Sequence, residues 1–203
     1  MKGSLVIIGA GGHAKVVIGT LQEIGHSISA VYDDNANKWG DEILGVPITG
    51  PTAASENEPF TTGIIAIGDN STRKKIARSL KLQWLTIVHP TAYVHRSVKL
   101  GSGTVVFAGA IIQPETVVGD HVIVNTGASV DHDCMVGDFV HLAPGVHLSG
   151  EVQVDEGAFL GIGSSVIPGI KIGSWTTLGA GGVAVRDLPS NKVALGVPAK
   201  LKS

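Results

Sequence analysis

The sequence predicts two domains, an α/β domain of the Rossmann type over residues 1–88 and an all-β parallel β-helix over residues 89–203. Three observations predict this division. Beyond residue 90 apolar residues recur at every sixth position, whereas before it apolar runs alternate with segments of helical spacing. The chain also holds 28 glycines and only 4% aromatic residues. A core of aliphatic side chains on a tightly turning backbone is typical of repetitive β structure.

The first domain is expected to alternate strands and helices. Its first strand covers residues 5–10, and a glycine-rich turn then leads into a segment whose apolar residues keep helical spacing. Further strands are expected at residues 28–32, 63–68 and 84–88, with a polar helix over residues 70–80. This alternation predicts a small parallel sheet with crossover helices.

The second domain shows a strict six-residue period. Stepping by six from Val94 to Ala184 meets an apolar residue every time, and all but the last are branched aliphatic residues. The column four residues later, from Val98 to Gly182, holds mostly small or β-branched residues. No charged residue enters either column.

This period fits neither a helix face, which repeats every 3.6 residues, nor a plain strand, which repeats every two. Three hexads per coil would stack the aliphatic column inside a triangular β-helix of about five coils, with the small residues at its corners. Gly101, Gly119 and Asp131 directly follow the aliphatic column, and we expect the coils to turn there. An aliphatic-rich β-sandwich is the alternative fold.

Charge and cysteine content restrict the function classes. The formal charge of −2 and the lack of Lys/Arg runs with interleaved aromatics argue against a nucleic-acid partner. The first apolar run is too short for a signal peptide or a membrane span, so no membrane insertion is expected. The single cysteine, Cys134, excludes an internal disulfide framework and favours a reducing, cytoplasmic location.

A glycine-rich turn points to a nucleotide. Gly9 and Gly11 are followed by Ala14 at the spacing of the dinucleotide fingerprint, and Asp33 and Asp34 come about twenty residues later. Glycines let the backbone approach a diphosphate, and the helix N-terminus supplies oriented N–H groups. The first domain is too short for a complete two-halved NAD fold, so a nucleotide sugar suits it better. The alternative is a tight turn without a ligand.

Histidines supply the candidate base. His132 lies between two acids, Asp131 and Asp133, and a neighbouring carboxylate would orient the ring and raise its basicity. His141 and His147 are further candidates, although single histidines such as His147 also suit a solvent-facing strand. Zinc held by these three histidines is the metal alternative. Their different positions within the hexad do not predict convergence on one ion, so no metal is expected.

With these residues in hand, the chain resembles the hexapeptide-repeat sugar acetyltransferases of the sialic acid O-acetyltransferase and bacillosamine N-acetyltransferase type. The resemblance spans nearly all 203 residues. The segments that carry it are residues 7–13, the Asp33–Asp34 pair, residues 65–70, 87–90, Asn125–Thr126 with residues 131–133, and the tail 196–200.

The resemblance implies a left-handed β-helix, a homotrimer, and acetyl-CoA lying in the groove between adjacent β-helices. It implies that His132 is the general base and that Asp133 raises its basicity. By the same resemblance, acetyl-CoA contacts His141, Ile162 and Ala180. The sugar-nucleotide pocket of the first domain would comprise Gly11, Gly12, His13, Asp33, Asp34 and Gly68.

The expected activity is direct transfer of an acetyl group from acetyl-CoA to a nucleotide-linked amino sugar, such as a UDP-4-amino sugar, for surface glycan biosynthesis. Cys134 occupies the small-residue column and is interpreted as a packing residue, not a nucleophile. Three alternatives stay open at this point. They are O-acetylation of sialic acid or another sugar, a carbonic-anhydrase-like metalloenzyme, and a non-catalytic binding protein.

Overall fold

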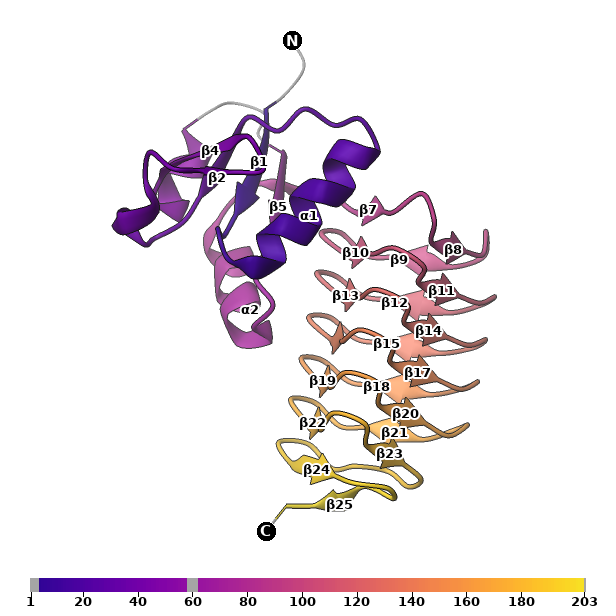
Figure 1. The fold of residues 1–203 in the computed structure, drawn as a ribbon. Coiled ribbons are helices and arrows are strands. Elements are labelled where there is room, and N and C mark those ends of the chain that lie inside the picture. The colour runs from indigo at the N-terminus through magenta and orange to yellow at the C-terminus, as the bar shows by residue number, and fades with distance from the viewer. Residues whose placement is uncertain (1–3, 58–61, 203) are drawn as a thin grey trace. The chain divides into compact units, whose positions relative to one another are not determined.

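The computed structural model describes residues 4–57 and 62–202, and the chain forms two compact units, Met1–Ile87 and Val88–Ser203 (Figure 1). In the described part of the chain, no helix is both long and apolar enough to cross a membrane.

The first unit is built on a six-stranded sheet of order β3-β4-β2-β1-β5-β6. Its strands are β1 (Leu5–Ile8), β2 (Ala30–Tyr32), β3 (Glu42–Ile43), β4 (Val46–Gly50), β5 (Thr62–Ile65) and β6 (Gln83–Trp84). Its helices are α1 (Gly12–Glu23) and α2 (Asn70–Ser79), with 3-10 turns η1 (Ala36–Lys38) and η2 (Thr52–Glu56).

The strand order of this sheet reverses beside β1. Strand β1 pairs in parallel with β2 on one side and with β5 on the other, so the order reverses between β1 and β5. In open α/β sheets ligands bind outside the carboxyl ends of the strands at such a point. The strand expected at residues 63–68 ends at Ile65, which leaves residues 66–69 as a loop at this edge.

The second unit is a stack of short parallel strands on three faces. The first face contains β7 (Ile87–Val88), β10 (Val105–Val106), β13 (Ile123–Val124), β16 (His141–Leu142), β19 (Phe159–Leu160), β22 (Thr177–Leu178), β24 (Val193–Leu195) and the antiparallel β25 (Lys200–Leu201). The second face contains β8 (Tyr93–Val94), β11 (Ile111–Ile112), β14 (Ser129–Val130), β17 (His147–Leu148), β20 (Ser165–Val166) and β23 (Val183–Ala184). The third face contains β9 (Lys99–Leu100), β12 (Val117–Val118), β15 (Met135–Val136), β18 (Gln153–Val154) and β21 (Lys171–Ile172).

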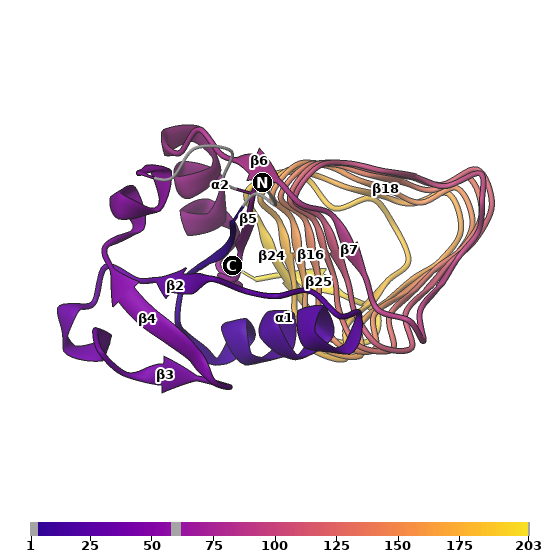
Figure 2. The ribbon, with the colours of Figure 1, turned by 90° about the horizontal axis from the view of Figure 1, so that it is seen from above.

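Register within each face confirms the three-hexad coil. Val105 pairs with Ile123, and Ser129 pairs with His147, so each coil advances by eighteen residues. Seen from above, the coils lie over one another (Figure 2). In the parallel strands the second residue points inward and builds one continuous aliphatic core, and the small-residue column is buried beside it.

The three corners of the coil differ in the residue that takes a left-handed backbone. The glycine corner, between the first and second faces, uses Gly109, Gly127, Gly145, Gly163 and Gly181. The acidic corner, between the second and third faces, uses Glu115, Asp133, Glu151 and Gly169. The aromatic corner, between the third and first faces, uses Gly103, His121, Phe139, Gly157 and Trp175.

This corrects one expectation from the sequence. The left-handed residue stands three positions after the aliphatic column, not directly after it. Glycines directly after the column, such as Gly137 and Gly161, are needed for another reason. A Cβ on Gly137 would lie 2.8 Å from the Glu156 backbone nitrogen of the next coil, because the coils pack too closely there for a side chain.

Candidate active site

The second unit presents a histidine–carboxylate pair at the acidic corner. His132 Nδ1 lies 2.8 Å from Asp133 Oδ2, and the two side chains are 54% and 55% exposed. Asp133 has the left-handed φ of 58° required at this corner, and Asp131 Oδ1 accepts a 2.8 Å hydrogen bond from the His132 N–H. The structure thus brings together the predicted base and its predicted acidic neighbour.

Electrostatics make His132 a better base. The hydrogen bond to Asp133 raises the pKa of His132 above its ordinary value of 6.5, and the charges of Asp131, Asp133 and Glu151 act in the same direction. Because Nδ1–H donates to the carboxylate, Nε2 is the nitrogen left to take a proton.

Gly150 is a site residue that the sequence did not identify. A Cβ built on it would lie 2.6 Å from Cε1 and 2.7 Å from Nε2 of His132, so the ring lies directly over this glycine. The backbone of Gly150 is outside the left-handed region, so the turn itself does not require glycine. Its position eighteen residues after His132, one coil further on, is the signal that could have found it.

The Gly150 amide is also available for chemistry. Among the described residues it donates to no protein acceptor, although the backbone N–H groups of the strands are paired from coil to coil. An N–H of this kind beside a catalytic base can stabilise a developing oxyanion.

The three predicted acetyl-CoA residues lie elsewhere on the coil. His141 is on β16 of the first face, with Nε2 3.2 Å from Asn125 Nδ2 and its ring edge-on to Phe159 at 5.2 Å. Ile162, 59% exposed, and Ala180 lie at the glycine corner in successive coils. In a triangular coil the acidic corner is opposite the first face, and the second face separates it from the glycine corner. One chain therefore does not bring His132 together with these three residues.

In the first unit, the predicted glycine-rich turn joins β1 to α1. Gly9 has a φ of 103°, and a Cβ on it would lie 2.6 Å from Ile67 Cγ1, so both requirements demand glycine there. Gly11 is the N-cap of α1 and Gly12 its first residue, and a Cβ on either would meet nothing within 4 Å. The N-cap and the first residue of α1 thus carry no side chain.

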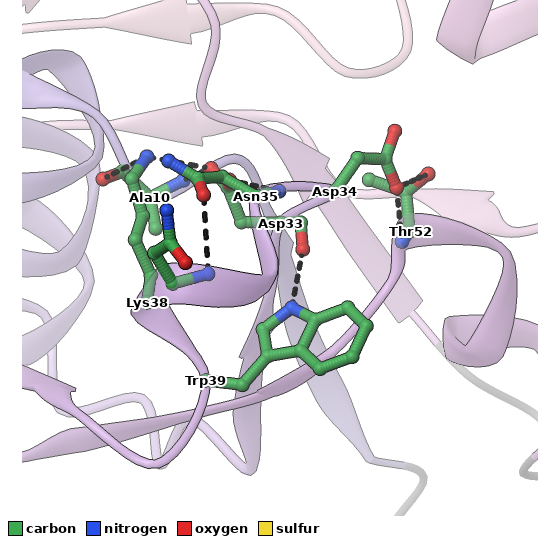
Figure 3. A network of polar contacts seen from close by, with 8 residues as sticks. Ala10, Asp33, Asp34, Asn35, Lys38, Trp39 and Thr52 are labelled. Carbon is green, nitrogen blue, oxygen red and sulfur yellow. Dashed lines mark hydrogen bonds and ion pairs between the residues drawn. The ribbon is translucent and has the colours of Figure 1, made fainter.

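Asp33 is part of a polar network that fixes this turn (Figure 3). Its Oδ2 accepts from the Ala10 N–H at 2.7 Å and from Lys38 Nζ at 3.1 Å, and Trp39 Nε1 donates to its carbonyl oxygen at 2.8 Å. Burial works against the charged carboxylate, but the hydrogen bonds from Ala10, Asn35 and Lys38 hold the pKa of Asp33 below its usual range. Asp33 therefore links the glycine-rich turn to the end of β2 through its hydrogen bond from Ala10.

Asp34 points to the other side of the same loop. Its Oδ1 accepts hydrogen bonds from the backbone N–H and the hydroxyl of Thr52, at 2.8 and 2.9 Å (Figure 3). Asp34 thus ties the end of β2 to the start of η2, and the two predicted acids do not act on the same partner.

His13 is the second residue of α1, which follows β1, and Gly68 lies on the loop that follows β5. Burial and the charge of Arg73 lower the pKa of His13 to about 4, so the ring is neutral near pH 7. The Gly68 carbonyl accepts a 3.2 Å hydrogen bond from the Arg73 guanidinium. Arg73 is a second site residue that the sequence analysis did not identify. The one signal for it in the sequence is its place as the fourth residue of the helix after β5.

No metal cluster appears among the described side chains, in which no group of three His, Cys, Asp or Glu residues could hold an ion. His147 instead faces Ser129, with 2.8 Å between Nδ1 and Oγ. Cys134 is fully buried, its thiol donates to the Ser149 carbonyl, and burial raises its pKa to about 11. A protonated, buried thiol is a poor nucleophile.

Known proteins share this architecture. Residues 4–80 match the family described as the PglD N-terminal domain. The chain is 46% identical to PerB from Caulobacter crescentus, solved in complex with CoA and GDP-perosamine, with a TM-score of 0.94 over 100% of this chain and 99% of PerB. It is 36% identical to the acetyltransferase domain of PglB from Neisseria gonorrhoeae FA1090, solved with acetyl coenzyme A, with a TM-score of 0.91 over 98% of each chain.

A curated protein is also similar in sequence to this chain. The UDP-N-acetylbacillosamine N-acetyltransferase of Bacillus subtilis (strain 168) is 41% identical over 97 residues, which is 45% of each protein. The chain spans less than half the length of the curated relatives it matches.

An α/β unit followed by a parallel β-helix with a basic histidine at a coil corner defines an acyltransferase of the hexapeptide-repeat class. With the whole-length similarity to PerB and PglB, the chain belongs to the hexapeptide-repeat sugar acetyltransferase family. The predicted fold, a Rossmann-like domain followed by a left-handed β-helix, is confirmed.

Proposed function

We propose that the protein is an acetyl-CoA-dependent N-acetyltransferase acting on a nucleotide-linked amino sugar. The observation that carries this proposal is the hydrogen-bonded His132–Asp133 pair on a β-helix, in a chain similar over its full length to PerB, which was solved with CoA and GDP-perosamine. The predicted domains, residues 1–88 for the sugar nucleotide and 89–203 for acetyl transfer, belong to the same proposal.

The proposed chemistry is a direct transfer. As the amine nitrogen of the sugar attacks the thioester carbonyl, His132 Nε2 takes the proton that the amine releases. The new C–N bond forms, the C–S bond breaks, and the proton passes from His132 to the departing thiolate. Asp133 holds the imidazolium in place, and the Gly150 N–H is the donor nearest to the base for the oxyanion.

The separation of the site residues supports an assembly. His141, Ile162 and Ala180, which we propose contact acetyl-CoA, lie on the first face and the glycine corner, away from His132 of the same chain. A neighbouring copy would bring its first face to the acidic corner and complete the site. We therefore propose a homotrimer with acetyl-CoA between adjacent β-helices.

The first unit would bind the sugar nucleotide. The proposed contacts lie at the carboxyl edge of its sheet and are Gly11, Gly12, His13, Asp33, Asp34 and Gly68. Asp33 and Asp34 would act by shaping the loops, because each already holds backbone groups of the unit. A cytoplasmic location and a role in surface glycan biosynthesis complete the proposal.

The test is thiol release from acetyl-CoA with a panel of UDP-linked and GDP-linked 4-amino sugars and free sialic acids. We expect turnover with one nucleotide-linked amino sugar and loss of turnover in His132→Ala, with coenzyme A binding retained. Turnover with sialic acid alone would favour O-acetylation. Unchanged turnover in His132→Ala would remove the base assignment.

A further inference from the structure

Arg73 is a buried cation that donates hydrogen bonds to the loop between β5 and α2. It lies on α2 with only 1% of its surface exposed. Its Nη1 donates to the carbonyl oxygens of Ile67 at 3.0 Å and Gly68 at 3.2 Å, and its Nη2 donates to Asn70 Oδ1 at 2.9 Å. A buried charge is costly unless its hydrogen bonds are made. The loop between β5 and α2 is therefore shaped around this guanidinium.

The carbonyl orientation fixes the amides of the same loop. In a trans peptide the C=O and N–H bonds point in opposite directions. Because the Ile67 and Gly68 carbonyls point toward Arg73, the N–H groups of the same two peptide units point away from it. Asp69 also caps α2 through a 2.8 Å bond from the Thr72 N–H, which holds the end of the loop in place.

This loop lies where the strand order reverses. It follows β5, and the glycine-rich turn follows the neighbouring strand β1. The two loops touch, because Gly9 has no Cβ where Ile67 packs. The amides of one loop and the start of α1 thus lie at the same edge of the sheet, and a diphosphate is the part of a sugar nucleotide that suits such donors.

Of Arg73 and His13, Arg73 is the residue that carries positive charge beside these two loops, and Lys38, whose Nζ donates to the Ala10 carbonyl at 3.2 Å, is a second cation at the glycine-rich turn. His13 is held neutral by burial and by the charge of Arg73, since its pKa is lowered to about 4. The pKa of Arg73 itself is lowered by burial to about 10, so the guanidinium stays charged at neutral pH.

We propose that Arg73 is a positioning residue for the diphosphate of the sugar nucleotide: it holds the Ile67 and Gly68 carbonyls inward so that the loop presents its amides to the phosphates, and it adds positive charge from below. This inference rests on the proposed function. In this inference Arg73 raises the affinity for the sugar nucleotide without contacting it.

The test compares three variants of the full chain. Arg73→Met removes the charge and the hydrogen bonds to Ile67, Gly68 and Asn70, and Arg73→Lys keeps the charge but lacks the planar fork. Arg78→Met is the matched control, because Arg78 is an exposed arginine of the same helix. Affinity for UDP and for GDP is measured by calorimetry, and affinity for coenzyme A serves as the internal control for folding of the β-helix.

We expect Arg73→Met to weaken binding of the preferred nucleotide at least tenfold, Arg73→Lys to weaken it less, and Arg78→Met to leave it unchanged, with coenzyme A affinity equal in all. In turnover, the KM for the sugar nucleotide should rise while kcat at saturation and the KM for acetyl-CoA stay near wild type. In Arg73→Met the pKa of His13, followed by NMR, should rise above about 4 because the charge that lowers it is gone.

Wild-type nucleotide affinity in Arg73→Met would overturn this inference alone. If Arg73→Met does not fold, Arg73→Lys decides, and wild-type affinity in that variant would overturn the role of the guanidinium geometry. A wild-type protein that binds neither UDP nor GDP would contradict the proposed function itself, and the thiol-release assay detects that case separately.

Discussion

The His132 imidazole lies over the backbone of Gly150, so close that a Cβ on Gly150 would be 2.6 Å from the ring. Consecutive coils stack in register, and residue 150 therefore lies beside residue 132. The next coil has no side chain at Gly150, and this gap is where the His132 ring lies.

The first prediction concerns this glycine. In Gly150→Ala the new methyl group displaces the His132 ring, while the amide and the Asp133 bond partner remain. We expect kcat to fall on the order of 100-fold, the cost typical of a small misplacement of a catalytic group. Steady-state kinetics measure it, with Gly19→Ala in α1 as control, since a Cβ there meets nothing within 4 Å. Wild-type kcat in Gly150→Ala would contradict the role of the ring position.

The second prediction concerns pH. The base must be neutral to act, so kcat/KM should rise with pH through the pKa of His132, which lies above 6.5. Asp133→Asn removes the hydrogen bond to a charged acceptor that raises this pKa. We expect the acid limb of the pH–rate profile to move to lower pH and the plateau rate to fall, because a weaker base transfers the proton less well. An acid limb at unchanged pH would argue that another group controls the rate.

The coil could be predicted from the sequence because the same burial pattern recurs in every six-residue segment. A core position every six residues leaves one way to bury Val106, Val124 and Leu142 together, and the structure buries all three. The hairpin of β3 and β4 was missed, although Leu44 and Gly45 both take left-handed backbones between its two short strands. It is short and contains Pro47, so its alternation gave too weak a signal.

The candidate site was only partly predictable. His132 and Asp133 are adjacent in sequence, so their pairing could be anticipated. Gly150 could have been found from its spacing of eighteen residues from His132, once the coil length was known. Arg73 acts through the direction of carbonyl groups, which no spacing in the sequence encodes. Asp33 was found from the fingerprint spacing, but its hydrogen bond from the Ala10 amide depends on how the turn folds against the end of β2.

The third prediction concerns the glycine corner. Ile162 is 59% exposed in a single chain. If it packs against acetyl-CoA, Ile162→Asp would bring a charge into that contact, and we expect the KM for acetyl-CoA to rise about tenfold or more. The KM for the sugar nucleotide should not change. Leu44→Asp, which adds the same charge at another exposed aliphatic residue, is the control. An unchanged KM for acetyl-CoA would remove Ile162 from the cofactor contact.

The fourth prediction separates direct transfer from a covalent route through Cys134. The thiol is buried and its pKa is raised to about 11, so it is protonated at neutral pH. Cys134→Ala should keep near wild-type kcat, and mass spectrometry of the wild-type protein mixed with acetyl-CoA should find no acetylated cysteine. An acetyl group on Cys134 that is released on adding the amino sugar would establish the covalent route instead.

The last prediction concerns stability below neutral pH. His13 has an ordinary pKa of 6.5 when the chain is unfolded and a pKa of about 4 in the fold. Above pH 6.5 the ring is neutral in both states, and its contribution to stability is fully present. As the pH falls from 6.5 toward 4 the unfolded chain takes up the proton and the folded protein does not, so stability is lost. Two and a half pKa units correspond to roughly 3 kcal/mol at most, of which about 2 kcal/mol should be lost between pH 7 and pH 5. Urea unfolding at these two pH values measures the loss of unfolding free energy. The His13→Gln variant has no titrating group at this position, so its loss should be smaller than that of the wild type by about 2 kcal/mol. Equal pH dependence in the two proteins would show that the ring is not held neutral in the fold.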